Sequence, residues 1–201
     1  MQIIKKVMSS CRWFSNTYWI IYNRFRFSIR GYKFGNNTKL IGKIYLKGRG
    51  ECVIGDNFRF TSGSNINPIS RNIRGSIYVK RGARLCIGNN VGFSSVCIWA
   101  NDSIRIGDNV NVGANVVIMD NDAHPIEYMA RRDVDKTFTH TKTAAIIIEN
   151  DVWIGMNSII LKGVSIGART IIGAGSVVTG FIPADCIAAG NPCHVVKKLK
   201  E

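Results

Sequence analysis

The residue best suited to acid–base chemistry in this 201-residue chain is His124, in the stretch Asp120-Asn121-Asp122-Ala123-His124-Pro125. An imidazole titrates near neutral pH, so it can take the proton of a hydroxyl group as that hydroxyl attacks an electrophile. The ordinary alternative for a lone loop histidine is a solvated surface residue. We interpret His124 as a general base because it lies at the start of a segment that interrupts a regular repeat.

The other two histidines, His140 and His194, are expected to be a loop residue and a residue beyond the last repeat. A zinc site of the carbonic anhydrase kind needs three imidazoles, two of them close together in the sequence. The three histidines of this chain are too widely spaced to supply such a pair. No metal site is therefore expected.

The repeat itself places an aliphatic residue at every sixth position: Ile148, Ile154, Ile160, Ile166, Ile172 and Val178. A period of six fits neither a helix nor plain strand alternation, but it fits short strands separated by corners. Three such strands form a triangular coil of about 18 residues. The positions two before them are small or β-branched, as a narrow interior corner requires: Ile146, Val152, Ser158, Val164, Thr170 and Ser176.

Sharp corners are indicated where Gly, Asn or Asp directly follows the aliphatic residue, as in Ile54-Gly55-Asp56-Asn57 and Ile106-Gly107-Asp108-Asn109. These residue types tolerate the left-handed backbone conformation. Ile106 and Ile148 stand in equivalent frames, yet the chain between them is more than twice as long as one coil. The sequence thus predicts an excursion at about 120–145, and an ordered excursion of this length is usually functional.

The C-terminal repeats carry specific motifs: Trp153-Ile154-Gly155, Gly173-Ala174-Gly175-Ser176-Val177-Val178-Thr179, Ile182-Pro183 and Ala188-Ala189-Gly190-Asn191-Pro192. With the repeat, they resemble the hexapeptide-repeat (left-handed β-helix) acyltransferases. The resemblance covers roughly residues 41–198 and is strongest to the maltose, galactoside, nodulation and surface-polysaccharide O-acetyltransferases. It implies an all-β fold, a left-handed parallel β-helix of six or seven coils. We expect a basic, aromatic N-terminal extension with a short helix at 1–35, the β-helix at 36–183 and a C-terminal tail at 184–201.

The resemblance implies acetyl-CoA-dependent O-acetylation of a sugar hydroxyl, within surface-polysaccharide assembly. His124 would be the general base, and the backbone N–H of Met156 would stabilise the oxyanion, which is worth about 2.7–4 kcal/mol when well aimed. Relatives are trimers, so we expect a homotrimer with its active site between adjacent subunits. Two alternatives stay open. One is an antibiotic-inactivating acetyltransferase of the same fold, and the other is a non-catalytic β-helix scaffold.

The resemblance also places acetyl-CoA along the outer surface of the coils. By position, the contacts are Trp153, Gly155, Ala174, Gly175 and Thr179, with Lys197 and Lys198 near the phosphates. Cations suit phosphate binding, although His194 stands where an arginine would be more persuasive. Plain corner geometry is the alternative interpretation of the small residues.

On the acceptor side, relatives carry an asparagine where this chain has Ser94 or Ser95. A hydroxyl lacks the paired donor and acceptor groups of an amide, which argues against maltose or galactoside as the acceptor. Asp102 and Asp122 are further acceptor-side candidates, although Asp102 also fits an ordinary corner.

The first 50 residues hold eleven Lys and Arg and no acidic residue, whereas residues 51–201 hold sixteen against thirteen. Aromatic residues such as Trp13, Phe14 and Trp19 alternate there with Arg12, Arg24 and Arg26. One interpretation is a helical cap over the open first coil. The other is an interfacial segment that makes peripheral contact with an anionic membrane.

Other partners and compartments are less favoured. The apolar run near the N-terminus is too short to span a bilayer. No small-x-small cleavage site follows it, so a cleavable signal peptide is not expected. No recognised nucleic-acid-binding motif accompanies the basic charge, so no nucleic acid partner is expected. The six cysteines lack paired metal spacing, and reduced thiols in the cytoplasm are the default.

Overall fold

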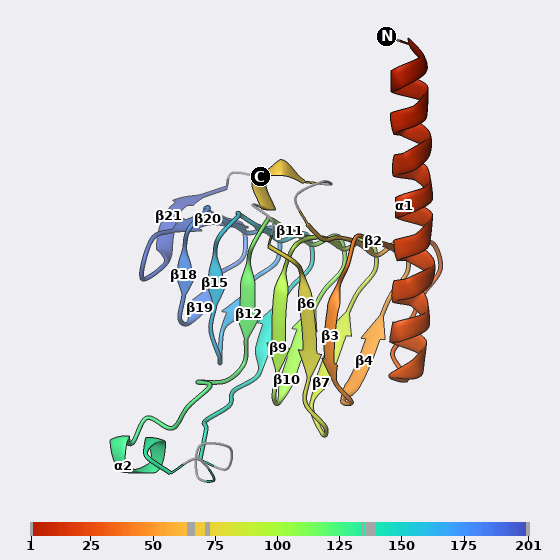
Figure 1. The fold of residues 1–201 in the computed structure, drawn as a ribbon. Helices are drawn as coiled ribbons and strands as arrows, with labels where there is room; N and C mark the ends of the chain where they lie inside the picture. The colour runs from red at the N-terminus through yellow and green to blue at the C-terminus, as the bar shows by residue number, and fades with distance from the viewer. Residues whose placement is uncertain (1, 64–66, 71–72, 134, 136–139, 200–201) are drawn as a thin grey trace.

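The computed structural model describes residues 2–63, 67–70, 73–133, 135 and 140–199, with side chains from residue 16 onward. Its core is a left-handed parallel β-helix of seven coils, as predicted (Figure 1). Each of the first six coils passes through three sheets in turn, and the seventh passes through the first two. The chain outside the coils forms an N-terminal helix, two excursions and a C-terminal strand that turns back on the last coil.

The three sheets stack equivalent strands of successive coils. The first sheet contains β1 (Lys33–Phe34), β4 (Glu51–Ile54), β7 (Arg84–Ile87), β10 (Ser103–Ile106), β13 (Ile146–Ile148), β16 (Ser165–Ile166) and β19 (Phe181–Ile182). The second contains β2 (Lys39–Ile41), β5 (Arg59–Thr61), β8 (Gly92–Ser94), β11 (Asn111–Val112), β14 (Trp153–Ile154), β17 (Ile171–Ile172), β20 (Cys186–Ala189) and the antiparallel β21 (His194–Lys198). The third contains β3 (Tyr45–Gly48), β6 (Ser76–Val79), β9 (Cys97–Ala100), β12 (Val117–Met119), β15 (Ile159–Ile160) and β18 (Val177–Val178).

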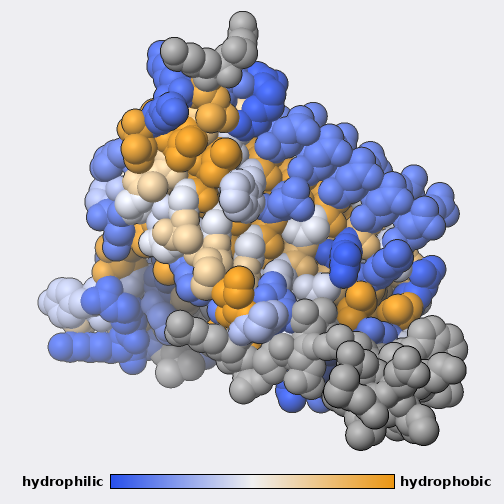
Figure 2. All heavy atoms as spheres, turned by 90° about the horizontal axis from the view of Figure 1, so that it is seen from above, coloured by the Kyte–Doolittle hydropathy of each residue, from blue (hydrophilic) through white to orange (hydrophobic). Residues whose placement is uncertain are grey.

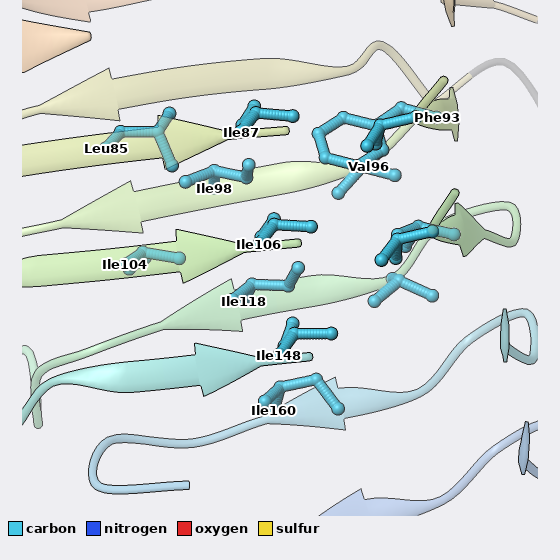
Figure 3. Close-up of a cluster of buried hydrophobic side chains, with 14 of the residues drawn as sticks. Leu85, Ile87, Phe93, Val96, Ile98, Ile104, Ile106, Ile118, Ile148 and Ile160 are labelled. Atoms are coloured by element: carbon cyan, nitrogen blue, oxygen red, sulfur yellow. The ribbon is translucent and has the colours of Figure 1, made fainter. Parts of the chain in front are cut away.

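The core is a stack of aliphatic side chains in register from coil to coil (Figure 3). Ile106 pairs with Ile148, and Ile148 with Ile166, so equivalent residues lie one above another. The six aliphatic residues at the predicted period are all fully buried, which confirms that prediction. Burying one such side chain contributes about 1.5–3 kcal/mol, so the repeat itself supplies much of the stability.

The first corner, between the first and second sheets, is built by asparagine and aspartate. Asn57, Asn90, Asn109 and Asp151 have φ of 57–60°, as the corner prediction required. Their side chains bond from coil to coil: the Asn57 amide donates to Asn90 (2.9 Å), and the Asn109 amide donates to Asp151 (3.1 Å). The same residues therefore adopt the left-handed backbone conformation that the corner needs and join neighbouring coils.

The predicted interior corner positions are buried as well. Ser158, Thr170 and Ser176 are 0% exposed, and each hydroxyl donates to a carbonyl of its own or the next corner. A buried hydroxyl without a partner would be costly. These bonds therefore explain why small polar residues are accepted at this buried position alongside valine and isoleucine.

The N-terminal helix α1 (Gln2–Ile29) closes the open end of the first coil with its C-terminal half (Figure 1). The buried amide of Asn23 donates to the carbonyls of Leu40 (3.1 Å) and Gly42 (2.7 Å). Arg26 and Arg30 donate to carbonyls of the same coil. Of the residues named in the two interpretations of this segment, the side chains of Arg12, Trp13 and Phe14 lie outside the described part.

Among the described residues, no helix combines the length and apolar character needed to cross a bilayer.

Two excursions leave the coils. The predicted one departs after β12 and returns at β13, and it contains α2 (Tyr128–Arg131) (Figure 1). A second one, which the sequence analysis missed, lies between β5 and β6 and contains the short 3-10 turn Pro68–Ser70. Ile54 pairs with Ile87 of the next coil, and the chain between them is nearly twice as long as a regular coil. The same comparison of spacings that located the first excursion locates the second.

Candidate active site

The excursion that carries His124 is anchored at its root by a buried carboxylate. Asp120 is 0% exposed, and its two oxygens accept hydrogen bonds from the backbone N–H groups of Asn101 (2.7 Å) and Asp102 (2.8 Å). The Asp120 carbonyl accepts from Ala144 N (3.0 Å) on the returning strand. These bonds hold the start of the excursion in place at the third corner, which lies between the third and first sheets.

A tight turn then carries the chain to His124. The Asn121 side chain accepts from Ala123 N (2.9 Å), and Ala123 has φ of 61°, an uncommon conformation for a residue with a Cβ. His124 N donates to the carbonyl of Asp122 (2.7 Å). The imidazole is exposed and has no hydrogen-bond partner in the described part of the chain. The backbone thus holds this side chain out toward solvent on a defined turn.

Asp122, a predicted acceptor-side residue, is engaged by Lys162, whose Nζ lies 2.9 Å from Asp122 Oδ1. The other carboxylate oxygen, Oδ2, is buried without a hydrogen-bond partner among the described residues. The ion pair links the excursion to the coil that follows it.

The second corner, between the second and third sheets, holds Met156. Gly175 N donates to the Met156 carbonyl (2.8 Å), and Asn157 N donates to Ala114 O (2.8 Å). The Met156 N–H has no acceptor among the described residues, and the equivalent N–H groups of Ala114 and Ala174 have none either. An unpaired N–H is therefore a shared property of this corner in these three successive coils.

The small residues of this corner let the coils stack closely. A Cβ on Gly155 would lie 2.5 Å from Ala174 N, which backbone atoms cannot accommodate. Corner geometry alone thus requires glycine at position 155. Ala174 and Gly175 are exposed, and a Cβ on Gly175 would meet nothing within 4 Å, although its φ of 73° still favours glycine.

A cavity of about 360 Å³ lies between the second sheet and the excursion that joins β5 to β6, which we call the 63–75 excursion. Its walls include Ser94 and Trp153, which were predicted to bind acceptor and coenzyme, so the structure brings these two together. They also include Arg59, Asn67 and Asn111. Figure 2 views the molecule from above and shows apolar and weakly polar residues flanked by rows of hydrophilic ones. A cavity that has both polar side chains and a tryptophan in its wall suits a ligand that has both hydroxyl groups and an apolar face.

Asn67 is the residue of this cavity that sequence reasoning missed. Its amide donates to Ser94 Oγ (2.5 Å), and the next coil contacts the same excursion through Asn115 and the carbonyl of Ile69 (3.5 Å). Ser95 is buried with φ of 48°, and its hydroxyl accepts from Gly63 N (3.1 Å). Ser94 therefore lines the cavity, whereas Ser95 holds the base of the excursion.

The predicted site residues lie at two different corners of the coil. Met156, Ala174 and Gly175 lie at the second corner, whereas His124 lies beyond the third. Within a coil, one strand of the third sheet separates these two corners. In the coil of β12, this strand and its flanking residues run from Asn115 to Asp120, which is about 16 Å of extended chain. Figure 1 shows the His124 excursion at the opposite end of these strands from the 63–75 excursion. One copy of the chain therefore does not bring the base and the N–H donor together.

The comparisons with known proteins agree with this architecture. Residues 145–180 match the family described as bacterial transferase hexapeptide (six repeats), and residues 84–119 match the hexapeptide repeat of succinyl-transferase. A maltose O-acetyltransferase structure from Clostridium difficile 630 is 30% identical, with a TM-score of 0.55, over 88% of this chain and 75% of that one. The chain belongs to the hexapeptide-repeat acyltransferase family.

Two further members of this family are informative. The galactoside O-acetyltransferase of Escherichia coli K12 is 34% identical over 126 residues, which are 62% of this chain and 59% of that protein. The chain thus spans less than two thirds of that relative's length. A Vibrio cholerae acetyltransferase solved with acetyl coenzyme A is 25% identical, with a TM-score of 0.56, over 89% of this chain and 79% of that one.

The remaining expected contact residues of this member of the hexapeptide-repeat acyltransferase family are exposed. Lys197 and Lys198 lie on β21, which pairs antiparallel with β20 at the end of the second sheet. Thr179 follows β18 and so lies at the third corner, away from Ala174. Asp102 is exposed at the third corner, where its N–H supports Asp120. The structure therefore gives Asp102 a structural role through its backbone.

Proposed function

We propose that this protein is an acetyl-CoA-dependent O-acetyltransferase that acts on a sugar hydroxyl, with His124 as the general base. The observation that carries the proposal is the pairing of two incomplete half-sites. One is an exposed imidazole on an anchored turn at the third corner. The other is the Met156 N–H at the second corner, which has no acceptor among the described residues and lies next to Gly113 in the cavity wall. The first half-site has a base but no oxyanion donor, and the second has an oxyanion donor but no base.

The proposed reaction is direct transfer. His124 accepts the proton of the sugar hydroxyl while its oxygen bonds to the thioester carbonyl carbon. The Met156 N–H donates a hydrogen bond to the oxyanion that develops. The carbon–sulfur bond then breaks, and the departing thiolate takes the proton from His124, which returns to its neutral form. The products are the acetylated sugar and free coenzyme A.

The proposal requires a homotrimer, because a threefold arrangement can bring the third corner of one copy to the second corner of the next. Acetyl-CoA would lie along the second corner, past Ala174 and Gly175 toward Lys197 and Lys198. Trp153 would flank its thioester end. Thr179 would reach the coenzyme from the third corner of the neighbouring copy.

The acceptor is proposed to occupy the cavity on the other side of Met156. The cavity lies against β5, β8, β11 and β14, whereas the proposed coenzyme path runs beside β17 and β20. Met156 directly follows β14 and so lies between the two. Asn67 supplies the amide that Ser94 does not, and Asp122 is a further candidate to hold a hydroxyl. Surface-polysaccharide assembly in the cytoplasm is the proposed setting.

The competing functions make different predictions. An antibiotic-inactivating acetyltransferase would acetylate small drugs, and a scaffold would release no coenzyme A with any acceptor. Release of free thiol from acetyl-CoA, measured with a panel of glycans and separately with a panel of antibiotics, distinguishes the three.

Replacing His124 tests the base directly. We expect His124→Ala and His124→Gln each to lower turnover at least about a hundredfold, since a general base contributes that much. Glutamine retains a hydrogen-bonding group but cannot take the proton. Coenzyme A affinity and thermal stability should stay at wild-type values, because the imidazole is exposed.

His140→Ala is the matched control, since it removes the other histidine of the same excursion. It should keep most of the activity. A His124→Gln variant that retains a tenth of wild-type turnover would place the base elsewhere.

A further inference from the structure

Helix α1 has two unlike faces. Asn23 and Phe27 are 0% exposed and face the first coil. Tyr18, Ile21, Phe25 and Ile29 are 58–65% exposed. Their spacing of three, four and four residues places them on one side of the helix, opposite Asn23 and Phe27. We call these four residues the α1 stripe.

The α1 stripe is a continuous exposed apolar surface and not a single exposed side chain. Four large apolar residues lie side by side on the outer face of a helix whose inner face is already occupied. In the sequence the same spacing continues through Phe14, Cys11, Val7 and Ile3. The 28-residue helix is about 42 Å long, so any partner of this face must present an extended surface.

The charge around the α1 stripe selects the kind of partner. The first 50 residues contain no acidic residue, and the exposed Lys33, Lys39 and Lys43 lie on the first coil, at the same end of the molecule. The α1 helix of a second copy would bring like charges together, which is unfavourable. An anionic surface complements this end.

We propose that the α1 stripe docks this protein on an anionic lipid surface. The helix lies in the interface with Tyr18, Ile21, Phe25 and Ile29 among the lipid headgroups and upper acyl chains. The basic residues of the first coil contact the anionic headgroups. Asn23, Arg26 and Arg30 keep their bonds to the coil, so docking needs no change in the cap. This inference does not depend on the proposed acetyl transfer.

The experiment is co-sedimentation of the full-length protein with lipid vesicles. Wild type should pellet with vesicles of phosphatidylcholine and phosphatidylglycerol, but not with phosphatidylcholine alone. Binding should weaken as salt shortens the Debye length from about 10 Å at 0.1 M to about 3 Å at 1 M. The double variant Ile21→Asp with Phe25→Asp should bind at least about tenfold more weakly, because it places charge on the apolar face.

The matched control is Phe181→Asp, which makes the same change at a residue that is 72% exposed in the last coil. It should bind vesicles like wild type. If the double variant loses its cooperative melting transition, Tyr18→Ser with Ile21→Ser replaces it.

Three results would each overturn the proposal. The first is a wild-type protein that fails to pellet with the anionic vesicles at low salt, and the second is a stripe variant that binds as tightly as wild type. The third is a lower molar mass of the stripe variant in light scattering, which would make the stripe an interface between copies.

Discussion

The ammonium group of Lys162 lies 2.9 Å from Oδ1 of Asp122, two residues before His124. Both side chains are partly buried, with 30% and 23% exposure. Lys162 belongs to the coil after the excursion, so this ion pair fixes the His124 turn to the body of the β-helix. Together with the buried Asp120 carboxylate, the pair holds the His124 turn in place.

We predict that Lys162→Met lowers kcat by about ten- to a hundredfold, because small displacements of a catalytic group are costly. Coenzyme A affinity should stay unchanged. Lys162→Arg, which retains the charge, should recover most of the rate. A loss of rate in Lys162→Met that is matched by a loss of melting temperature would make the role purely structural, whereas a loss of rate at an unchanged melting temperature supports positioning. Steady-state kinetics and thermal melting of the two variants decide.

Asn67 is predicted to act on the acceptor. Removing its amide in Asn67→Ala should raise the acceptor KM about fivefold, which corresponds to a hydrogen bond of about 1 kcal/mol. The acetyl-CoA KM should not change. Ile73→Ala, an exposed change in the same excursion, serves as the control. An equal rise in both KM values would show that the excursion matters only for the fold.

Asn23 is predicted to hold the cap. Asn23→Ala leaves the carbonyls of Leu40 and Gly42 without their buried donor, which should lower the free energy of unfolding by about 1–3 kcal/mol. Ser28→Ala, on the exposed side of the same helix, should change it little. Denaturant unfolding of both variants measures the difference. Equal stability of the two would mean that α1 does not cap the coil.

The repeat made most of the fold predictable. A period of six allows one arrangement of aliphatic residues inside and Asn or Asp at the corners, and the burial of Ile154 and the φ of Asn57 follow from it. The resemblance then assigned roles to His124 and Met156 by motif, and these roles stay predictions. Both predictions rest on local sequence, where each residue's environment is set by its own coil.

Other features were not local. The role of Asp120 depends on two N–H groups of the preceding coil, and the contact of Asn67 with Ser94 joins two distant parts of the chain across an irregular segment. The spacing from Ile54 to Ile87 would have located that second excursion. No pattern would have placed Asn67 over Ser94, because the path of an irregular excursion depends on tertiary contacts.

The central claim is that the site forms between two copies, and mixing two inactive variants tests it most directly. His124→Ala removes the base, and Ala174→Trp fills the proposed coenzyme path at an exposed corner position. Each variant alone should be inactive. After unfolding and refolding together in equal amounts, about one interface in four should combine an intact His124 with an intact Ala174 from the neighbouring copy. The account predicts recovery of about a quarter of wild-type acetyl transfer. No recovery from mixed oligomers would contradict it.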